Sequence, residues 1–197
     1  MKVLSTLALL LVAAAALAGV VPGDKAPDFV LPDLDGKEHS LDEYLDQGKI
    51  VVLEWFNPDC PFIKKHHLQA HTMNETYERF RDKGVVWLAI NSGAEGKQGA
   101  GRERNLQARE DYDLAFPLLL DPAGTVGQSY GAKTTPHMFV IKADGTIAYT
   151  GAIDDDNSAG TFGKTNHVAE ALSAVLAGEP VAQPETRPYG CSVKYAD

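Results

Sequence analysis

Cysteine is scarce in this chain: its 197 residues include only Cys60 and Cys191. Two cysteines allow one disulfide and no more, and the absence of a CxxC pair or a cysteine cluster excludes a structural zinc site built from cysteines. Positive charge is also in deficit, because 18 lysines and arginines face 27 acidic residues, for a formal net charge of −9. A surface of this sign repels nucleic acid and anionic lipid, so we expect no nucleic-acid partner.

Long hydrophobic runs are absent after the N-terminus, which has one from Leu4 to Ala18 behind the positively charged Met1-Lys2 start. Ala16-Leu17-Ala18 supplies a small-x-small cleavage pattern, and these features together are typical of a secretory signal peptide. The run is short for a membrane span, and no second one follows. We therefore expect an exported protein, periplasmic or extracellular, that is not membrane-integral after signal removal. An uncleaved N-terminal anchor is the alternative.

The overall composition is ordinary, with 44% hydrophobic and 23% charged residues, which fits one globular domain with appendages. The predicted organisation is a signal peptide at 1–18, one domain at 19–178 and an extended C-terminal tail at 179–197. The tail contains Pro180, Pro184 and Pro188, and it carries Cys191. There is no internal repeat and no sign of a second domain.

Strand and helix signals alternate along the domain, which predicts an α/β fold with a mixed central sheet flanked by helices. β-branched and aromatic segments predict strands at 50–56, 85–90, 116–120, 137–141 and 147–151. Helical patterns predict helices at 60–82, 103–112, 126–130 and 166–176.

Before this core, two short extended pieces flank an Asp35-Gly36 turn and predict an N-terminal hairpin extension at 29–31 and 38–40. Ser40 is the predicted N-cap of a short helix, with Glu43 placed as in a capping box.

The motif that points to chemistry is Pro58-Asp59-Cys60-Pro61 between a strand and a helix. Unpaired backbone N–H groups at a helix N-terminus favour negative charge, and the thiolate is the reactive form of cysteine. At such sites a cysteine pKa falls from about 8.5 to roughly 3.5–7.5. Lys64 and Lys65 are expected to add positive charge, while Asp59 opposes ionisation. The alternative is an inert buried cysteine or half of a structural disulfide.

Thr135-Pro136 is the second element, because a proline that opens an inner strand is unusual unless its peptide bond is special. With these segments in view, the chain resembles the thioredoxin-like superfamily in its redoxin (AhpC/TSA-type) branch, and within it the peroxiredoxin-like proteins. The resemblance implies a thioredoxin-like fold with a cis Thr135-Pro136 bond against Cys60. The matching segments are 23–29, 55–62, 131–136, 151–155 and 190–194.

Two departures from the family pattern limit the chemistry. Thioredoxins carry CxxC, but Ile63 stands where the second cysteine belongs, so Cys60 has no adjacent resolving thiol. The peroxide-reactive cysteine of peroxiredoxins aligns with the same position and follows PxxxTxxC, which is absent here. The resemblance therefore argues against peroxidase activity, and peroxiredoxin-like antioxidant activity is only an alternative.

Cys191 decides how the site works, because a tail that folds back would bring it to Cys60. It would then resolve a mixed disulfide, or form a static disulfide that pins the tail and contributes about 4–5 kcal/mol by chain entropy. Redox potential separates the two roles, since structural disulfides have potentials below about −300 mV.

Metal binding is the weaker interpretation of the remaining polar residues. A regular helix places His67 and His71 on the same face but about 10 Å or more from Cys60 along the axis, too far to share an ion with it. A Cys60/His137 copper site or a cation at Asp154-Asp155-Asp156 is the alternative to packing and solvation roles.

We therefore predict an exported thiol–disulfide oxidoreductase that acts on protein thiols or disulfides and needs no cofactor or metal. Cys60 and Cys191 are the predicted catalytic residues, and Thr135, Pro136 and Pro61 are predicted to receive the partner's backbone. The alternative function is a redox-inactive thioredoxin-fold module that binds a protein or a copper ion.

Overall fold

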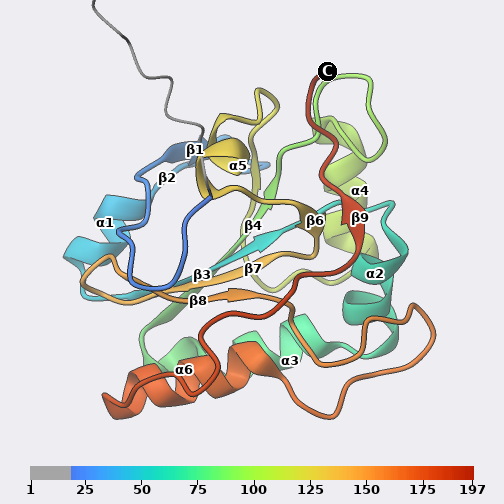
Figure 1. The fold of residues 1–197 in the computed structure, drawn as a ribbon. Helices are drawn as coiled ribbons and strands as arrows, with labels where there is room; N and C mark the ends of the chain where they lie inside the picture. Colours follow the sequence, from blue (N-terminus) through green and yellow to red (C-terminus); the bar gives the residue numbers. More distant parts are fainter. Residues whose placement is uncertain (1–18) are drawn as a thin grey trace, which may run out of the picture.

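A mixed five-stranded sheet lies at the centre of the molecule, with strand order β5-β4-β3-β7-β8 (Figure 1). The structure is a computed structural model that describes residues 19–197, so the predicted signal peptide at 1–18 lies outside the described residues. The strands are β3 (Ile50–Trp55), β4 (Val85–Asn91), β5 (Leu118–Leu120), β7 (Met138–Ile141) and β8 (Ile147–Gly151). β3 runs parallel to β4 and antiparallel to β7, which makes the sheet mixed.

Helices cover both faces of this sheet. The helices are α1 (Leu41–Asp46), α2 (Pro61–Lys64), α3 (Thr72–Phe80), α4 (Arg102–Asp111), α5 (Thr125–Tyr130) and α6 (His167–Ala177). In Figure 1, α3 and α6 lie below the sheet, while α5 and the hairpin of β1 (Val30–Pro32) and β2 (Glu38–Ser40) lie above it. Among residues 19–197, no helix combines the length and apolar character that a membrane crossing requires.

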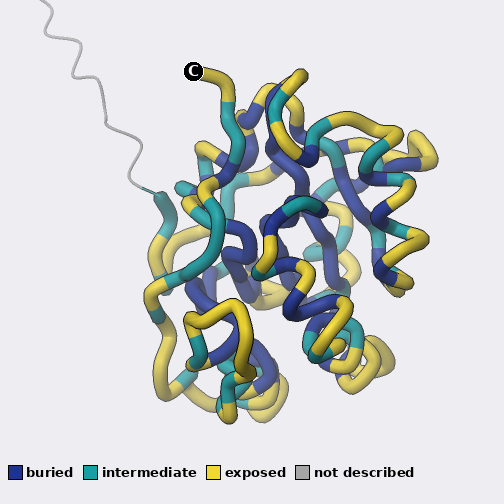
Figure 2. Tube along the Cα trace, turned by 90° about the vertical axis from the view of Figure 1, so that its right-hand side faces the viewer, coloured by how far each residue is buried: buried dark blue, intermediate teal, exposed yellow. Residues whose placement is uncertain are grey.

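The alternation of side chains along β3 divides the core in two. On one face of the sheet, Val51, Leu53 and Trp55 pack in a cluster with residues of the β1–β2 hairpin. On the other face, Val52 packs with residues of α3 and α6, together with Phe56 just beyond the strand. All six residues of β3 are buried. Figure 2 shows the buried dark blue segments in the interior of the molecule, with exposed yellow segments around them. The predicted α/β fold, mixed sheet and N-terminal hairpin are confirmed.

The predicted single helix over 60–82 is wrong. The chain forms α2 and then a π-helical turn, η1 (Lys65–Gln69). His71 interrupts the helix with a left-handed backbone conformation, φ 51°. The chain then continues as α3 and a 3₁₀ turn, η2 (Arg81–Lys83). In a regular helix successive side chains point about 100° apart. The wider π turn buries the consecutive residues Lys65, His66 and His67 together, and each of them has its own polar partner.

This break also separates the two histidines that a regular helix would place on one face. His67 is buried and His71 is exposed. The Nε2–H of His67 donates to Glu54 Oε1 on β3 at 2.7 Å, while Glu54 Oε2 accepts from Trp87 Nε1 at 3.0 Å. Glu54 is fully buried, so these two donors replace the water that its carboxyl group loses on folding.

We expect His67→Phe to lower the free energy of unfolding by about 3 kcal/mol, because a buried carboxyl group then loses one of its two donors. Phenylalanine keeps the ring contacts with Phe56 and Tyr112. Urea unfolding at pH 7 measures the change. The control is His71→Asn at the exposed left-handed position, which should change stability by no more than about 0.5 kcal/mol. Equal losses in both variants would contradict the assigned role of Glu54–His67.

Candidate active site around Cys60 and Cys191

Cys60 lies in the connection between β3 and α2, directly before the first residue of the helix. Asn57, Pro58 and Asp59 turn the chain, and the backbone N–H of Cys60 donates to the Asn57 carbonyl at 3.1 Å. Cys60 is then the N-cap residue of α2, with Pro61 at the first helical position, as the motif predicted. The side chain is only 1% exposed, and its thiol donates to the Thr135 carbonyl oxygen at 3.0 Å.

Lys65 and Asp59, whose charges were expected to act on Cys60, form their hydrogen bonds with other residues. Lys65 is fully buried and donates from Nζ to the carbonyls of Asp156 at 2.7 Å and Ser158 at 3.0 Å. A buried ammonium group needs such acceptors, so Lys65 serves this loop instead of the sulfur. Asp59, the expected opposing charge, accepts two hydrogen bonds from Arg104, at 3.0 and 2.7 Å from Nε and Nη2. Lys64 is exposed.

Cys191 reaches the site through a short strand that the sequence did not predict. β9 (Cys191–Ser192) pairs antiparallel with β6 (Thr134–Thr135), and Cys191 lies opposite Thr135. The pairing continues where the Val193 N–H donates to the Lys133 carbonyl at 3.1 Å. β6 and β9 lie side by side at the right of Figure 1. The tail is therefore built into the site as a strand.

The two thiols interact. Burial first, and then a hydrogen bond and an electrostatic interaction with Cys60, raise the pKa of Cys191 to about 11. Both cysteines are free thiols in the structure. Cys60 is buried, while Cys191 is partly exposed and packs against the core cluster that contains Cys60.

The residues predicted to receive a partner are close to the cysteines, but they are not free. The Thr135-Pro136 bond is cis, and both residues are buried. The strand edge that they offer is occupied by β9, with Thr135 Oγ1 3.5 Å from the Cys191 carbonyl oxygen. Pro61 is exposed beside Cys60. The chain's own tail thus fills the groove in which a partner's backbone was expected.

His137 is turned to other partners. Its Nδ1 accepts from the Lys133 N–H at 3.3 Å, its Nε2–H donates to Thr150 at 3.1 Å, and its ring packs on Phe139 with centroids 4.5 Å apart. Both ring nitrogens are engaged, which leaves none for a metal ion shared with Cys60. Within residues 19–197, no three His, Cys, Asp or Glu side chains gather where they could hold a metal ion.

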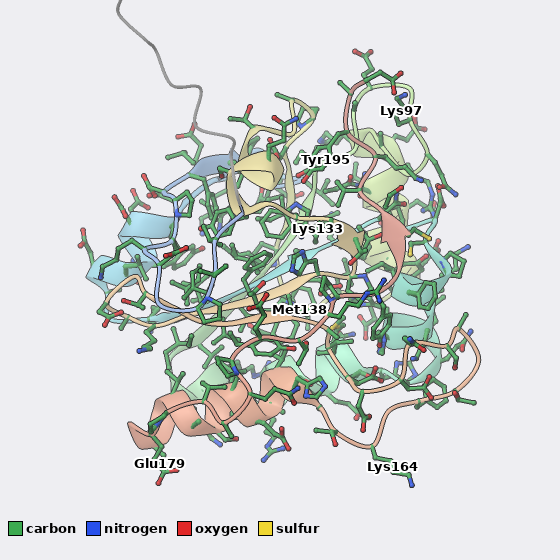
Figure 3. All side chains as sticks on the ribbon, in the orientation of Figure 1. Lys97, Lys133, Met138, Lys164, Glu179 and Tyr195 are labelled. Carbon is green, nitrogen blue, oxygen red and sulfur yellow. The ribbon has the colours of Figure 1, made fainter. Side chains whose placement is uncertain are left out.

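Sequence reasoning missed two residues that shape this site. Arg104 neutralises Asp59 from α4, and Tyr189 anchors the tail two residues before Cys191. Neither contact has a sequence signal, because 45 residues separate Arg104 from Asp59 and 35 separate Tyr189 from Asp154. Beyond β9 the Tyr195 hydroxyl donates to the Ala132 carbonyl at 2.9 Å, and Figure 3 labels Tyr195 with Lys133 below it.

A cysteine between a central strand and a helix, facing a cis-proline turn in a mixed sheet, defines a thioredoxin-like protein. The AhpC/TSA family matches residues 22–150, and the chain belongs to that family.

Relatives and solved structures agree with this assignment. The thiol-disulfide oxidoreductase ResA of Geobacillus thermodenitrificans is 35% identical over 128 residues, which cover 65% of this chain and 67% of that protein. The crystal structure of a hypothetical protein from Sinorhizobium meliloti 1021 superposes with a TM-score of 0.82 at 26% identity and covers 91% of this chain and 97% of its own. The thioredoxin domain of a thiol-disulfide oxidoreductase from Bacteroides vulgatus shares the fold, with a TM-score of 0.56 at 23% identity over 67% of this chain and 89% of its own.

Gly190→Ala tests whether strand pairing holds Cys191. Gly190 has φ 130°, and a Cβ there would collide with the Thr135 carbonyl, so alanine should force β9 away from β6. We expect the pKa of Cys191 to fall from about 11 toward 9 as burial is lost. The rate of iodoacetamide alkylation against pH, followed by mass spectrometry, measures it. Gly160→Ala, where a Cβ has open space, is the control, and an unchanged profile in Gly190→Ala would contradict the assignment.

The free energy of unfolding should depend on pH through His137. Burial, and then Lys133, lowers the pKa of His137 to about 3, so between pH 6.5 and 3 the unfolded chain binds a proton that the folded chain does not. Stability therefore falls as pH falls through this window, by about 2 kcal/mol from this residue at pH 5. In His137→Gln, the loss between pH 7 and 5 should be smaller by that amount in urea unfolding. An identical loss in both proteins would rule this out.

Proposed function

We propose that this protein is an exported thiol–disulfide oxidoreductase that works through the Cys60–Cys191 pair. The observation that carries the proposal is the pairing of β9 with β6. One residue, Thr135, accepts the hydrogen bond of the Cys60 thiol and lies opposite Cys191 in the register. Two sulfurs held across one residue are suited to share a disulfide. The name of the ResA relative supports the same class of reaction.

Cys60 is the proposed nucleophile because the raised pKa of Cys191 keeps that thiol protonated at neutral pH. The Cys60 thiolate attacks one sulfur of a partner's disulfide, the partner's S–S bond breaks, and the second partner sulfur leaves as a thiolate. The product is a mixed disulfide between Cys60 and the partner. Arg104 pairs with the carboxylate of Asp59, the residue that precedes Cys60 in the chain, and so offsets its negative charge.

Cys191 then resolves the mixed disulfide. Its thiol passes its proton to a partner thiolate, and its sulfur attacks Cys60. The Cys60–partner bond breaks, the second partner sulfur leaves as a thiolate that takes a proton from water to give the dithiol, and the protein holds a Cys60–Cys191 disulfide. Two electrons have passed from protein to partner. The same steps in reverse oxidise a partner dithiol, and the relative reduction potentials set the direction.

A cleft beside the tail offers room for part of a partner while the tail is in place. A cleft of about 410 Å³ is lined by Phe62, Thr134, Asn157 and the tail residues 187–190. We propose that the residues flanking a partner's cysteine enter here and that Pro61, Thr135 and Pro136 contact its backbone. Export follows from the N-terminal sequence pattern, and an oxidising compartment is where such a disulfide persists.

The mass of the exported protein without reductant tests this function. We expect it to lack residues 1–18 and to be lighter by two hydrogens than the reduced form. In glutathione buffers the pair should interconvert at a potential above about −300 mV, unlike a structural disulfide. Cys60→Ser should abolish the exchange. Cys191→Ser should trap a mixed disulfide with glutathione at Cys60.

Ser192→Ala is the matched control, since this exposed neighbour in β9 should leave the exchange unchanged. A disulfide that resists glutathione would favour a static pin on the tail. Two thiols that never join, with no labelling of Cys60, would favour the redox-inactive binding module.

A further inference from the structure

Between Thr186 and Cys191 the tail crosses the mouth of the site with one aromatic anchor, Tyr189. Before it, the Thr186 N–H donates to the Thr150 carbonyl at 3.1 Å, and after it β9 begins. Only Gly190 separates Tyr189 from Cys191, and Gly190 has a positive φ of 130°. The position of the Tyr189 ring therefore fixes where the chain enters β9.

The Tyr189 hydroxyl sits in a buried chain of hydrogen bonds. It donates to Asp154 Oδ1, and its oxygen lies 2.8 Å from His66 Nε2. Because the phenol proton goes to Asp154, His66 donates from Nε2 and its Nδ1 accepts from the Thr72 hydroxyl at 3.4 Å. Burial lowers the pKa of His66 to about 4, which matches this neutral tautomer at pH 7.

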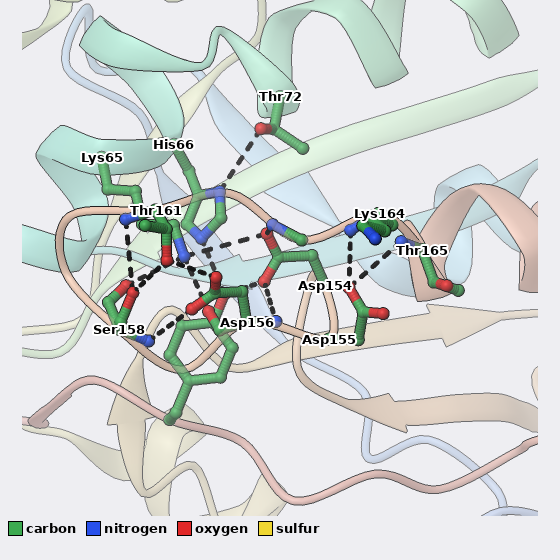
Figure 4. A network of polar contacts seen from close by, with 12 residues as sticks. Lys65, His66, Thr72, Asp154, Asp155, Asp156, Ser158, Thr161, Lys164 and Thr165 are labelled. Carbon is green, nitrogen blue, oxygen red and sulfur yellow. Dashed lines mark hydrogen bonds and ion pairs between the residues drawn. The ribbon is translucent and has the colours of Figure 1, made fainter.

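The Tyr189 ring is held as firmly as its hydroxyl. It packs edge-on against Phe62 of α2 with centroids 5.6 Å apart, and the Lys65 ammonium lies 5.3 Å from its centroid. Lys65 also lies 3.8 Å from Asp154 Oδ2, so the same buried cation contacts both the ring and the acceptor of its proton. Figure 4 shows Lys65 reaching from the helix to Ser158 and Asp154, with His66 beside it pointing its other ring nitrogen toward Thr72.

We propose that Tyr189, held by His66, Asp154 and Lys65, is a positioning residue that keeps Cys191 against Cys60. This inference rests on the proposed function and adds its regulation. With Tyr189 seated, β9 covers Cys60, the effective concentration of Cys191 at Cys60 is high, and a Cys60–Cys191 disulfide is favoured. With Tyr189 released, Cys60 is open to a partner. The tail is thus an internal competitor for the strand edge that a partner needs.

The consecutive residues Lys65, His66 and His67 of the π turn all contribute to holding the tail at the site. Lys65 and His66 hold the tail through Asp154 and Tyr189, while His67 fixes the turn to the sheet through Glu54. The turn begins ten residues after the end of β3 and five residues after Cys60, so one helical segment carries both the proposed nucleophile and the residues that hold Tyr189. A movement of the π turn would therefore also move Cys60, and a movement of Cys60 would move the π turn.

Tyr189→Phe tests the proposal because it removes both hydrogen bonds and keeps the ring against Phe62. In a Cys191→Ser background, where Cys60 is the single thiol, we expect Tyr189→Phe to raise the rate of iodoacetamide labelling of Cys60 about tenfold. In the protein with both cysteines, the glutathione equilibrium should shift about tenfold toward the dithiol. Asp154→Asn keeps an acceptor for the phenol proton, so its labelling rate and glutathione equilibrium should lie between those of the unsubstituted protein and those of Tyr189→Phe.

Tyr130→Phe is the matched control, since it removes one phenol hydrogen bond, to the Pro27 carbonyl, from a buried tyrosine on the opposite side of the sheet. It should move neither readout. Tyr195→Phe removes the tail's hydrogen bond to Ala132 beyond β9, and a shift equal to that of Tyr189→Phe would show that any tail contact suffices and overturn the assignment.

The two readouts separate this proposal from the proposed function. If Cys60 and Cys191 never form a disulfide, the function fails while the labelling rate still reports on Tyr189. If the disulfide forms but Tyr189→Phe changes neither the labelling rate nor the equilibrium, the positioning role is wrong and the exchange function stands.

Discussion

The backbone of Thr135 is the constraint on which the site depends. Its carbonyl accepts the thiol of Cys60 from the start of α2, and its strand pairs with β9 so that Cys191 lies opposite. Two cysteines 131 positions apart in the chain become neighbours because each is tied to the same residue. The cis bond to Pro136 and the central strand β7 beyond it hold that residue in a buried position.

Burial gives the two sulfurs different characters. Cys60 is enclosed between helix and tail, whereas Cys191 is partly exposed and has a raised pKa. A thioredoxin places its second cysteine one helical turn after the first, but here that position is Ile63, which is fully buried in the core. The tail supplies the second thiol from a separate strand, so its reactivity depends on whether the strand is seated.

The buried polar residues of the π turn connect this site to the rest of the fold. Lys65, His66 and His67 would each be costly to bury alone, and each is balanced by a partner from a different segment. Those partners are the loop after β8, the tail and the central strand. The turn therefore joins three parts of the chain at the helix that carries Cys60.

The sequence by itself determined the architecture and the position of Cys60 between a strand and a helix. The apolar runs of β3 and β4, the Ser40 cap, and Pro61 after Cys60 are local signals, because strand burial, capping and a proline at the first helical position depend on near neighbours. Only the tertiary structure decided the break at His71, the pairing of Arg104 with Asp59, and the seating of Tyr189 and β9. Those depend on contacts between segments far apart in the chain, and no local pattern encodes which distant partner a buried charge or an unpaired strand edge will meet.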